Sequence, residues 1–374
     1  MAGGGNKFIK SVVWSPDGNC LLSSTEDSGM LVHQLDGALL DECRYYSAGR
    51  TIQTDGESSN VASSSNGMHL RLSLNGGSPV YACQWYPCMN SQNPETCCFI
   101  STCKDRPVQL WSALAGQVRC SYVARNHMDE LETSTIVGFN LQGNRIYAGS
   151  KSAIRVFDVD TPGSSCSERR HKGMVSALAF NPDYSGAYAA GTYAKSITIY
   201  VEDVELPALE LSALDFDVTC LKWSSDGVNL WAGGRNHDDI VCWDLRHTRA
   251  EVGRIKRKLS SSQKMAFDLD PWSSHVVTGS QDGKILFYDA TTFALAASHS
   301  PAATDCTNGV SMHPFASLLA VSSGQRHFAL HDVDDDDNLE GVMAAAAESI
   351  TSDSKLSLWT MPYTQREGVQ NDNN

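Results

Sequence analysis

Basic side chains recur in one kind of segment of this chain, the short polar turns that join two apolar strand-like runs. Lysine and arginine in such turns bind phosphate groups. A tyrosine and a histidine stand in comparable segments, and aromatic rings of this kind stack on unpaired bases. The pattern predicts a surface for single-stranded nucleic acid. Its turn residues are Lys104, Arg106, Lys151, Tyr193, Lys195, Arg235 and Arg326.

The loops that lead into the repeated units carry further cations, which we expect on the same face as the turns because antiparallel strands alternate in direction. These residues are Arg125, His127, Arg169, Arg170, His171, Lys172 and Lys264. Two turns depart from the pattern, since one contains Glu26 and Asp27 and another contains Asp282. A simpler explanation stays open, because lysine and arginine are common in exposed turns.

A second basic run, RHTRAEVGRIKRK, spans residues 246–258. Its residues Arg254, Lys256, Arg257 and Lys258 are candidates for an RNA contact or a nuclear-import signal. A solvated connection between two units explains the run equally well.

These positions recur because the chain itself is repetitive. An apolar strand that ends in a large residue and is followed by a turn occurs seven times, with the large residues Trp14, Trp85, Phe139, Phe180, Trp223, Leu269 and Met312. The later copies are about 41 to 46 residues apart, the period of four-stranded propeller blades. We therefore predict an all-β fold, a single seven-bladed WD-repeat β-propeller over residues 6–363.

Each blade also needs a third strand with alternating apolar positions, and the matching runs are VQLWS, IRVFD, ITIY, IVCWD, ILFYD and FALHD. Longer spacings of about 71 and 54 residues place insertions in the first two blades. Residues 47–67 predict a disordered insert, and we expect the same of the acidic segment 333–354 and the tail 364–374. We expect KLSLWTM, residues 355–361, to supply the outer strand of the last blade.

The formal net charge of −14 argues against phosphate binding by the chain as a whole. Eight acids, however, lie in residues 332–353, which contain no Lys or Arg. The negative charge is therefore concentrated in this segment and is not spread over the whole chain. The twelve cysteines lie singly or as the pair Cys97 and Cys98, without the spacing of a zinc site, so we expect reduced core thiols and no metal.

Enzyme motifs are missing from the sequence. It contains no nucleophile elbow, phosphate-binding glycine loop or HExxH pattern, so we expect no catalysis, no cofactor and no small-molecule substrate. The aspartates that close third strands, such as Asp158 and Asp244, are explained by tight-turn hydrogen bonds. The sequence contains no stretch of 18 or more apolar residues, so we predict no membrane span.

Several longer phrases are more particular than a WD repeat: RNHMDELETS (125–134), VCWDLRH (241–247), FDLDP (267–271), DCTNGVSMHP (305–314) and SGQR (323–326). In this order they resemble the telomerase Cajal body protein family, from about Phe8 to Arg326. The resemblance adds Asn126, Asn308 and Gln325 to the candidate RNA-binding residues, because they lie in the matching segments.

This resemblance implies a non-catalytic nuclear scaffold that binds the CAB-box loop of small Cajal body RNAs and of telomerase RNA. It implies H/ACA ribonucleoprotein proteins and telomerase as partners, support of telomere maintenance, and location in Cajal bodies, with some protein in the cytoplasm. The family commonly has a long N-terminal extension, of which this sequence has almost none, so the import route and any partner that docks on such an extension stay open.

A protein-binding adaptor, such as a cullin-RING ligase substrate receptor, is a different class that also stays open. Residues 243–246, WDLR, match the WDxR pattern by which such receptors dock their ligase. Crosslinked RNA would favour the scaffold, whereas recovery of ligase subunits without RNA would favour the adaptor.

Overall fold

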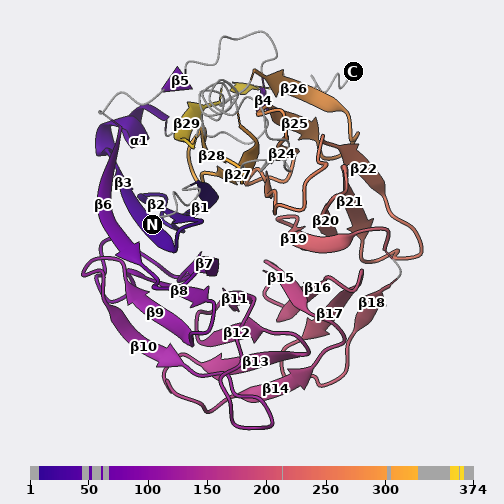
Figure 1. Cartoon of the computed structure of the whole chain (residues 1–374). Coiled ribbons are helices and arrows are strands. Elements are labelled where there is room, and N and C mark those ends of the chain that lie inside the picture. The colour runs from indigo at the N-terminus through magenta and orange to yellow at the C-terminus, as the bar shows by residue number, and fades with distance from the viewer. Residues whose placement is uncertain are drawn as a thin grey trace, which may run out of the picture.

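Seven four-stranded antiparallel sheets form a ring around an open centre (Figure 1). The computed structural model describes residues 8–43, 50–52, 60–61, 67–212, 214–300, 305–326, 354–361 and 363–365. The predicted seven-bladed β-propeller is confirmed. One short helix, α1 (Gly37–Cys43), is present in the part of the chain that the structure describes.

The first six blades each use strands in chain order from the centre outward. Blades 1 and 2 consist of β1 (Ile9–Trp14), β2 (Cys20–Thr25), β3 (Gly29–Leu35), β6 (Met68–Asn75), β7 (Val80–Trp85), β8 (Cys98–Cys103), β9 (Val108–Ser112) and β10 (Val118–Tyr122). Blades 3 and 4 consist of β11 (Ile136–Phe139), β12 (Arg145–Gly149), β13 (Ala153–Asp158), β14 (Ser167–Arg170), β15 (Val175–Phe180), β16 (Ala187–Thr192), β17 (Ile197–Val201) and β18 (Leu209–Leu211). Blades 5 and 6 consist of β19 (Asp217–Trp223), β20 (Asn229–Arg235), β21 (Asp239–Asp244), β22 (Gly253–Lys256), β23 (Phe267–Leu269), β24 (His275–Gly279), β25 (Ile285–Asp289) and β26 (Leu295–His299).

The large residues that defined the repeat end the innermost strands. Three of them are tryptophans that join one blade to the one before it. The indole N–H of Trp85 donates to the carbonyl of Val13 at 3.1 Å, and that of Trp223 donates to Ala179 at 3.0 Å. These contacts explain why the repeat favours tryptophan, since a buried indole needs an acceptor and a neighbouring strand supplies it.

Blade 7 corrects two expectations. Its strands are β27 (Thr307–Met312), β28 (Leu318–Ser323), β29 (Leu356–Thr360) and β5 (Asn60–Val61). The KLSLWTM segment thus forms the third strand, β29, and not the outer one. The run FALHD, predicted as that third strand, lies outside the described residues. Both third-strand candidates have alternating apolar positions, so the local pattern did not separate them.

The outer strand of blade 7 comes from the first blade's insert. Within the insert the structure describes only the backbone of β4 (Arg50–Ile52) and β5, and β5 pairs with β29. The other short strand, β4, pairs with β30 (Tyr363–Gln365). The first and last blades are therefore linked by strand pairing between distant parts of the chain, although two residues offered no recognisable strand pattern in the sequence. The acidic segment 333–353 lies outside the described residues.

Candidate nucleic-acid interface

A central cavity of about 1880 Å³ opens among the innermost strands of the ring. Its lining includes turns between second and third strands, such as the one with Lys151, and loops between blades, such as the one with Lys264. These two sets of segments therefore share one face, as the alternation of strand direction predicted.

Nine of the thirteen predicted binding residues line this cavity. They are Lys104, Arg125, Asn126, His127, Lys151, Tyr193, Lys264, Gln325 and Arg326. The structure does not place Arg106, Lys195, Arg235 or Asn308 in the lining.

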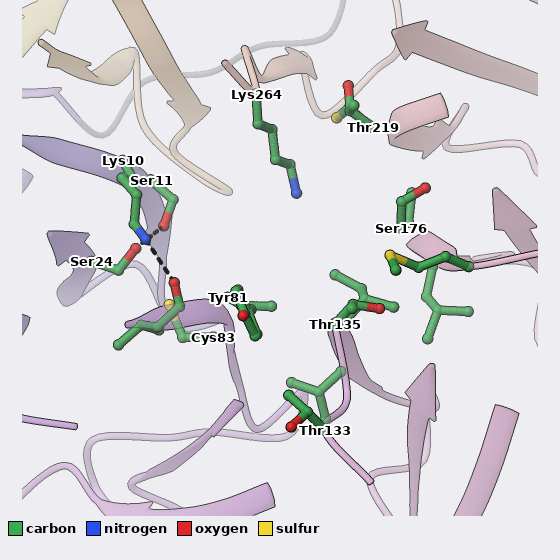
Figure 2. Close-up of a pocket in the computed structure, with 18 of the residues that line it drawn as sticks. Lys10, Ser11, Ser24, Tyr81, Cys83, Thr133, Thr135, Ser176, Thr219 and Lys264 are labelled. Carbon is green, nitrogen blue, oxygen red and sulfur yellow. Dashed lines mark hydrogen bonds between the residues drawn. The ribbon is translucent and has the colours of Figure 1, made fainter. Parts of the chain in front are cut away.

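Three lysines of the lining are exposed and form no ion pair with any residue in the described ranges: Lys104, Lys151 and Lys264. Figure 2 shows Lys264 extended into the open centre, with Lys10 and Ser24 on one side and Ser176 and Thr219 on another. Lysines without an acidic partner keep their full charge for an anion that enters the cavity.

Other cations of the lining are already engaged. Arg326 forms an ion pair with Glu26. The same carboxylate also pairs with Lys10, with 3.1 Å between Lys10 Nζ and Glu26 Oε2. Arg125 donates to the carbonyl of Asp129 at 2.6 Å. The acidic turn that departed from the sequence pattern thus neutralises two cations beside it, so the free charge lies mainly with the three lysines.

Asn126 shapes the loop that it occupies. Its side-chain oxygen accepts hydrogen bonds from the backbone N–H groups of Met128 at 2.9 Å and Glu130 at 3.0 Å. These bonds present Met128 and His127 as exposed side chains at the edge of the cavity. Asn126 therefore acts through the loop's conformation, because its amide oxygen is occupied.

Tyr193 and Arg235 form one unit between blades 4 and 5. The Arg235 guanidinium lies 4.4 Å from the centroid of the Tyr193 ring and pairs with Asp217 at 2.9 Å. Only Tyr193 lines the cavity, so Arg235 fixes the orientation of the ring from behind. The neighbouring Lys195 donates to the carbonyl of Asp215 at 3.3 Å.

Asn308, which the sequence placed among the binding residues, is 1% exposed and lies inside the protein. Its amide N–H groups donate to the carbonyls of Ile9 and Gly324, both at 2.8 Å, and its oxygen accepts from Ser322 at 2.8 Å. A fully bonded buried amide of this kind specifies packing. The residue therefore joins blade 7 to blade 1.

Sequence reasoning missed several charged residues of the lining, including Lys10 on β1, Lys222 on β19 and Arg155 on β13. Arg155 is buried between Glu132 at 2.8 Å and Glu168 at 3.1 Å. Polar positions inside the otherwise apolar strands IKSVVW and DVTCLKW were the available signal for the two lysines. In all, nine Lys and Arg residues and four Asp and Glu residues line the cavity, so it is cationic in an acidic chain.

Burial and neighbouring charges shift the pKa values of several groups in the wall. Burial lowers the pKa of His171, whose Nε2 has no hydrogen-bond partner. Burial raises the pKa of the Cys83 thiol to about 11. Burial alone would lower the pKa of Lys222, but Asp268 at 2.8 Å raises it above its ordinary value. The lining thus offers positive charge and hydrogen-bonding groups.

The second basic run divides into three environments. Arg254 is bound to Asp215, Asp239 and Glu251 at 2.9, 3.3 and 2.7 Å. Arg257 is buried, and its desolvation lowers its pKa to about 10. Of the four candidate residues of the run, Lys256 and Lys258 are exposed and have no ion pair among the described residues.

On the opposite face, the WDxR arginine is held by its own turn. Arg246 contacts both carboxylate oxygens of Asp244, at 3.0 and 2.7 Å, and lowers the pKa of Asp244 to about 2. This contact satisfies the arginine within the protein, which is the simple explanation for a single WDxR match.

Disulfides, metal clusters and membrane-spanning helices are features of other protein classes. Eleven of the twelve cysteines are free thiols, and the side chain of the twelfth, Cys43 at the end of α1, is not among those described. No cluster of three metal-ligating side chains occurs among the described residues. No helix in the described ranges has the length and apolar character needed to span a membrane.

Comparisons with known proteins agree with this architecture. Residues 3–33 match the description "WD domain, G-beta repeat". The chain is 30% identical to human Telomerase Cajal body protein 1 over 94% of this chain and 63% of that protein. It is 31% identical to the Drosophila melanogaster homolog of that protein, over 86% of this chain and 58% of the relative.

A Schizosaccharomyces pombe protein named "Guanine nucleotide-binding protein negative regulator 1" is 28% identical over 74% of this chain and 69% of its own length. The chain spans about 60% of the length of the human and Drosophila relatives. The similarity to them covers nearly all of the propeller, so this chain is a seven-bladed WD-repeat propeller similar to the telomerase Cajal body proteins.

Proposed function

We propose that this chain is a non-catalytic RNA-binding scaffold, and that the mouth of the central cavity is its RNA site. Its RNAs are those with a CAB-box loop, the small Cajal body RNAs and telomerase RNA. In this proposal the protein directs such H/ACA-type ribonucleoproteins to Cajal bodies in the nucleus and so supports telomerase and telomere maintenance. The family name, which joins telomerase to Cajal bodies, supports this choice of partners.

One observation carries the proposal: Lys104, Lys151 and Lys264 converge from three parts of the ring on one cavity and have no acidic partner among the described residues. A cationic cavity in an acidic chain is selective for an anion that reaches into it, because the surrounding surface repels other contacts. Phosphates of an unpaired RNA loop have the charge and the flexibility to meet all three lysines.

Bases would be held by the aromatic side chains of the mouth. The Tyr193 ring is oriented by Arg235, and His127 is exposed on the loop that Asn126 holds. Single-stranded RNA is recognised mainly through such stacking, since unpaired bases expose their faces. The cavity volume of about 1880 Å³ is large enough to receive more than one base.

In-cell crosslinking followed by sequencing of the bound RNA tests this function. We expect H/ACA-type RNAs to be enriched with the wild type and lost with K151E/K264E, which reverses two free charges at the cavity. The control is R71E/R249E, which makes the same change of net charge at exposed sites outside the cavity lining. Recovery of ligase subunits without RNA would replace this proposal with the adaptor function.

A further inference from the structure

A second cavity, of about 440 Å³, lies between blades 5 and 6. We call it the blade 5–6 groove. Its residues come from the end of β22 and the connection that follows it, from two turns at 236–238 and 280–284, and from β25 and β26. The charged residues among them are Lys256, Arg257, Lys258, Lys284, Asp238 and Asp282.

The groove has an excess of positive charge that the protein itself does not neutralise. Lys284 is paired with Asp282 at 3.0 Å, but Lys256 and Lys258 have no ion pair in the described ranges. Arg257 lies beneath them at 2% exposure and donates to the carbonyl of Met265 and the hydroxyl of Thr278, both at 3.1 Å. No carboxylate among the described residues is hydrogen-bonded to the guanidinium, and Asp238 acts on it only through space, so the arginine adds to the positive potential of the groove.

Two buried polar atoms in the groove also indicate a binding site. Arg257 Nε and Asp282 Oδ1 are both buried without a hydrogen-bond partner. The rest of each side chain is bonded, since Arg257 donates to Met265 and Thr278 and Asp282 pairs with Lys284. A single buried polar atom without a partner still calls for an explanation, and a bound ligand is one. The arginine also holds the Met265 carbonyl, which fixes the connection between the groove and the central cavity.

This connection brings the two cavities within reach of one ligand. Lys258 in the groove and Lys264 in the central cavity are six residues apart in one segment. Six residues span at most about 21 Å when fully extended. The turns 236–238 and 280–284 join second to third strands, so the groove opens on the face that carries the mouth of the central cavity.

We propose that the blade 5–6 groove binds the sugar-phosphate backbone of the RNA whose unpaired loop occupies the central cavity. This inference rests on the proposed function. Lys256 and Lys258 meet phosphates, and Leu286 and Leu295 form an apolar wall for ribose. No aromatic residue is among the described residues of its lining, so the groove adds affinity without reading bases.

The test uses the full chain and an H/ACA-type hairpin RNA recovered by crosslinking, as the whole hairpin and as its isolated loop. Affinities are measured by fluorescence anisotropy at several salt concentrations. For K256A/K258A we expect about tenfold weaker binding of the hairpin, with a salt slope smaller by about 1.5, because two phosphate contacts are lost. Binding of the isolated loop stays at the wild-type level, and R71A/R249A retains wild-type binding of both RNAs.

The possible failures are distinct. Unchanged hairpin affinity in K256A/K258A, together with loss of binding in K151E/K264E, would overturn the groove and leave the central site intact. Wild-type binding of polyglutamate that is lost in K256A/K258A, without any effect on the hairpin, would make the groove a site for acidic protein segments. Failure of the wild type to bind either RNA would overturn both proposals.

Discussion

The indole N–H of Trp14 donates to the backbone carbonyl of Ser311 at 2.9 Å, across 297 positions of sequence. Trp14 ends the innermost strand of blade 1, and Ser311 lies in that of blade 7. The same contact joins Trp85 to Val13 and Trp223 to Ala179 between consecutive blades. The same kind of indole-to-carbonyl hydrogen bond therefore joins the last blade to the first and joins neighbouring blades elsewhere in the ring.

Replacing this tryptophan tests the closure. W14F removes the donor and leaves the Ser311 carbonyl without its partner in a buried site, so we expect the free energy of unfolding to fall by about 1 to 3 kcal/mol. Chemical denaturation measures the change, and W223F should lose a similar amount. A W14F protein as stable as the wild type would show that the contact does not hold the ring.

Asn308 separates a structural role from a binding role. N308A removes the buried hydrogen bonds to the carbonyls of Ile9 and Gly324 and the acceptor of Ser322, while the Gly324 carbonyl keeps its bond from Gln263. We expect a loss of about 2 to 4 kcal/mol in the free energy of unfolding. Below its unfolding transition the variant should bind RNA as the wild type does. Weaker RNA binding by folded N308A would return this residue to the interface.

Stacking on Tyr193 is tested by removing the ring. Y193L should weaken binding of a single-stranded RNA by about 1 to 3 kcal/mol, the usual contribution of one stacked base. Y193F should retain binding because it keeps the ring, and R235M should have an intermediate effect because it only frees the ring. Anisotropy titrations measure all three, and equal affinities for wild type and Y193L would exclude stacking at this site.

The stability of the propeller should fall as the solution becomes more acidic. Burial lowers the pKa of His33, His171 and His299 below the ordinary histidine value of 6.5, so the unfolded chain binds protons that the folded chain does not. Their contribution is complete above that value and is lost as the pH falls through it.

Thermal denaturation between about pH 7.5 and pH 5.5 measures this dependence. The melting temperature of the wild type should decrease over this range, and H33Q/H171Q/H299Q should show a shallower decrease. An identical pH dependence in the triple variant would assign the effect to other groups.

The repeat was readable from the sequence because each blade buries the same kinds of side chain at the same positions. The seven large residues from Trp14 to Met312 predicted the ends of the innermost strands correctly. Closure was not readable in this way, because β5 contributes only two residues and its pairing partner β29 is distant in sequence. Strand pairing over such distances depends on tertiary placement and leaves no periodic signal.

The candidate site was predictable as a set of loops but not as a set of free charges. Turn position identified Lys104 and Lys151 for the cavity, whereas the pairing of Arg326 with Glu26 joins segments 300 positions apart. Lys284 in the second groove was also missed, because it lies far from the basic run in sequence and joins it only in the folded blade pair. Charge compensation is a tertiary property, so residue type alone did not reveal it.

The salt dependence of RNA binding tests the central claim most directly, because it counts the phosphates that the protein neutralises. The measurement compares the dissociation constant of an H/ACA-type hairpin for the wild type and for K104A/K151A/K264A over a range of salt concentrations. The account predicts weaker binding by the variant and a slope smaller by about 2 to 3, one contact for each free lysine. An unchanged slope and affinity would contradict it, since the mouth of the central cavity would then not be where RNA is bound.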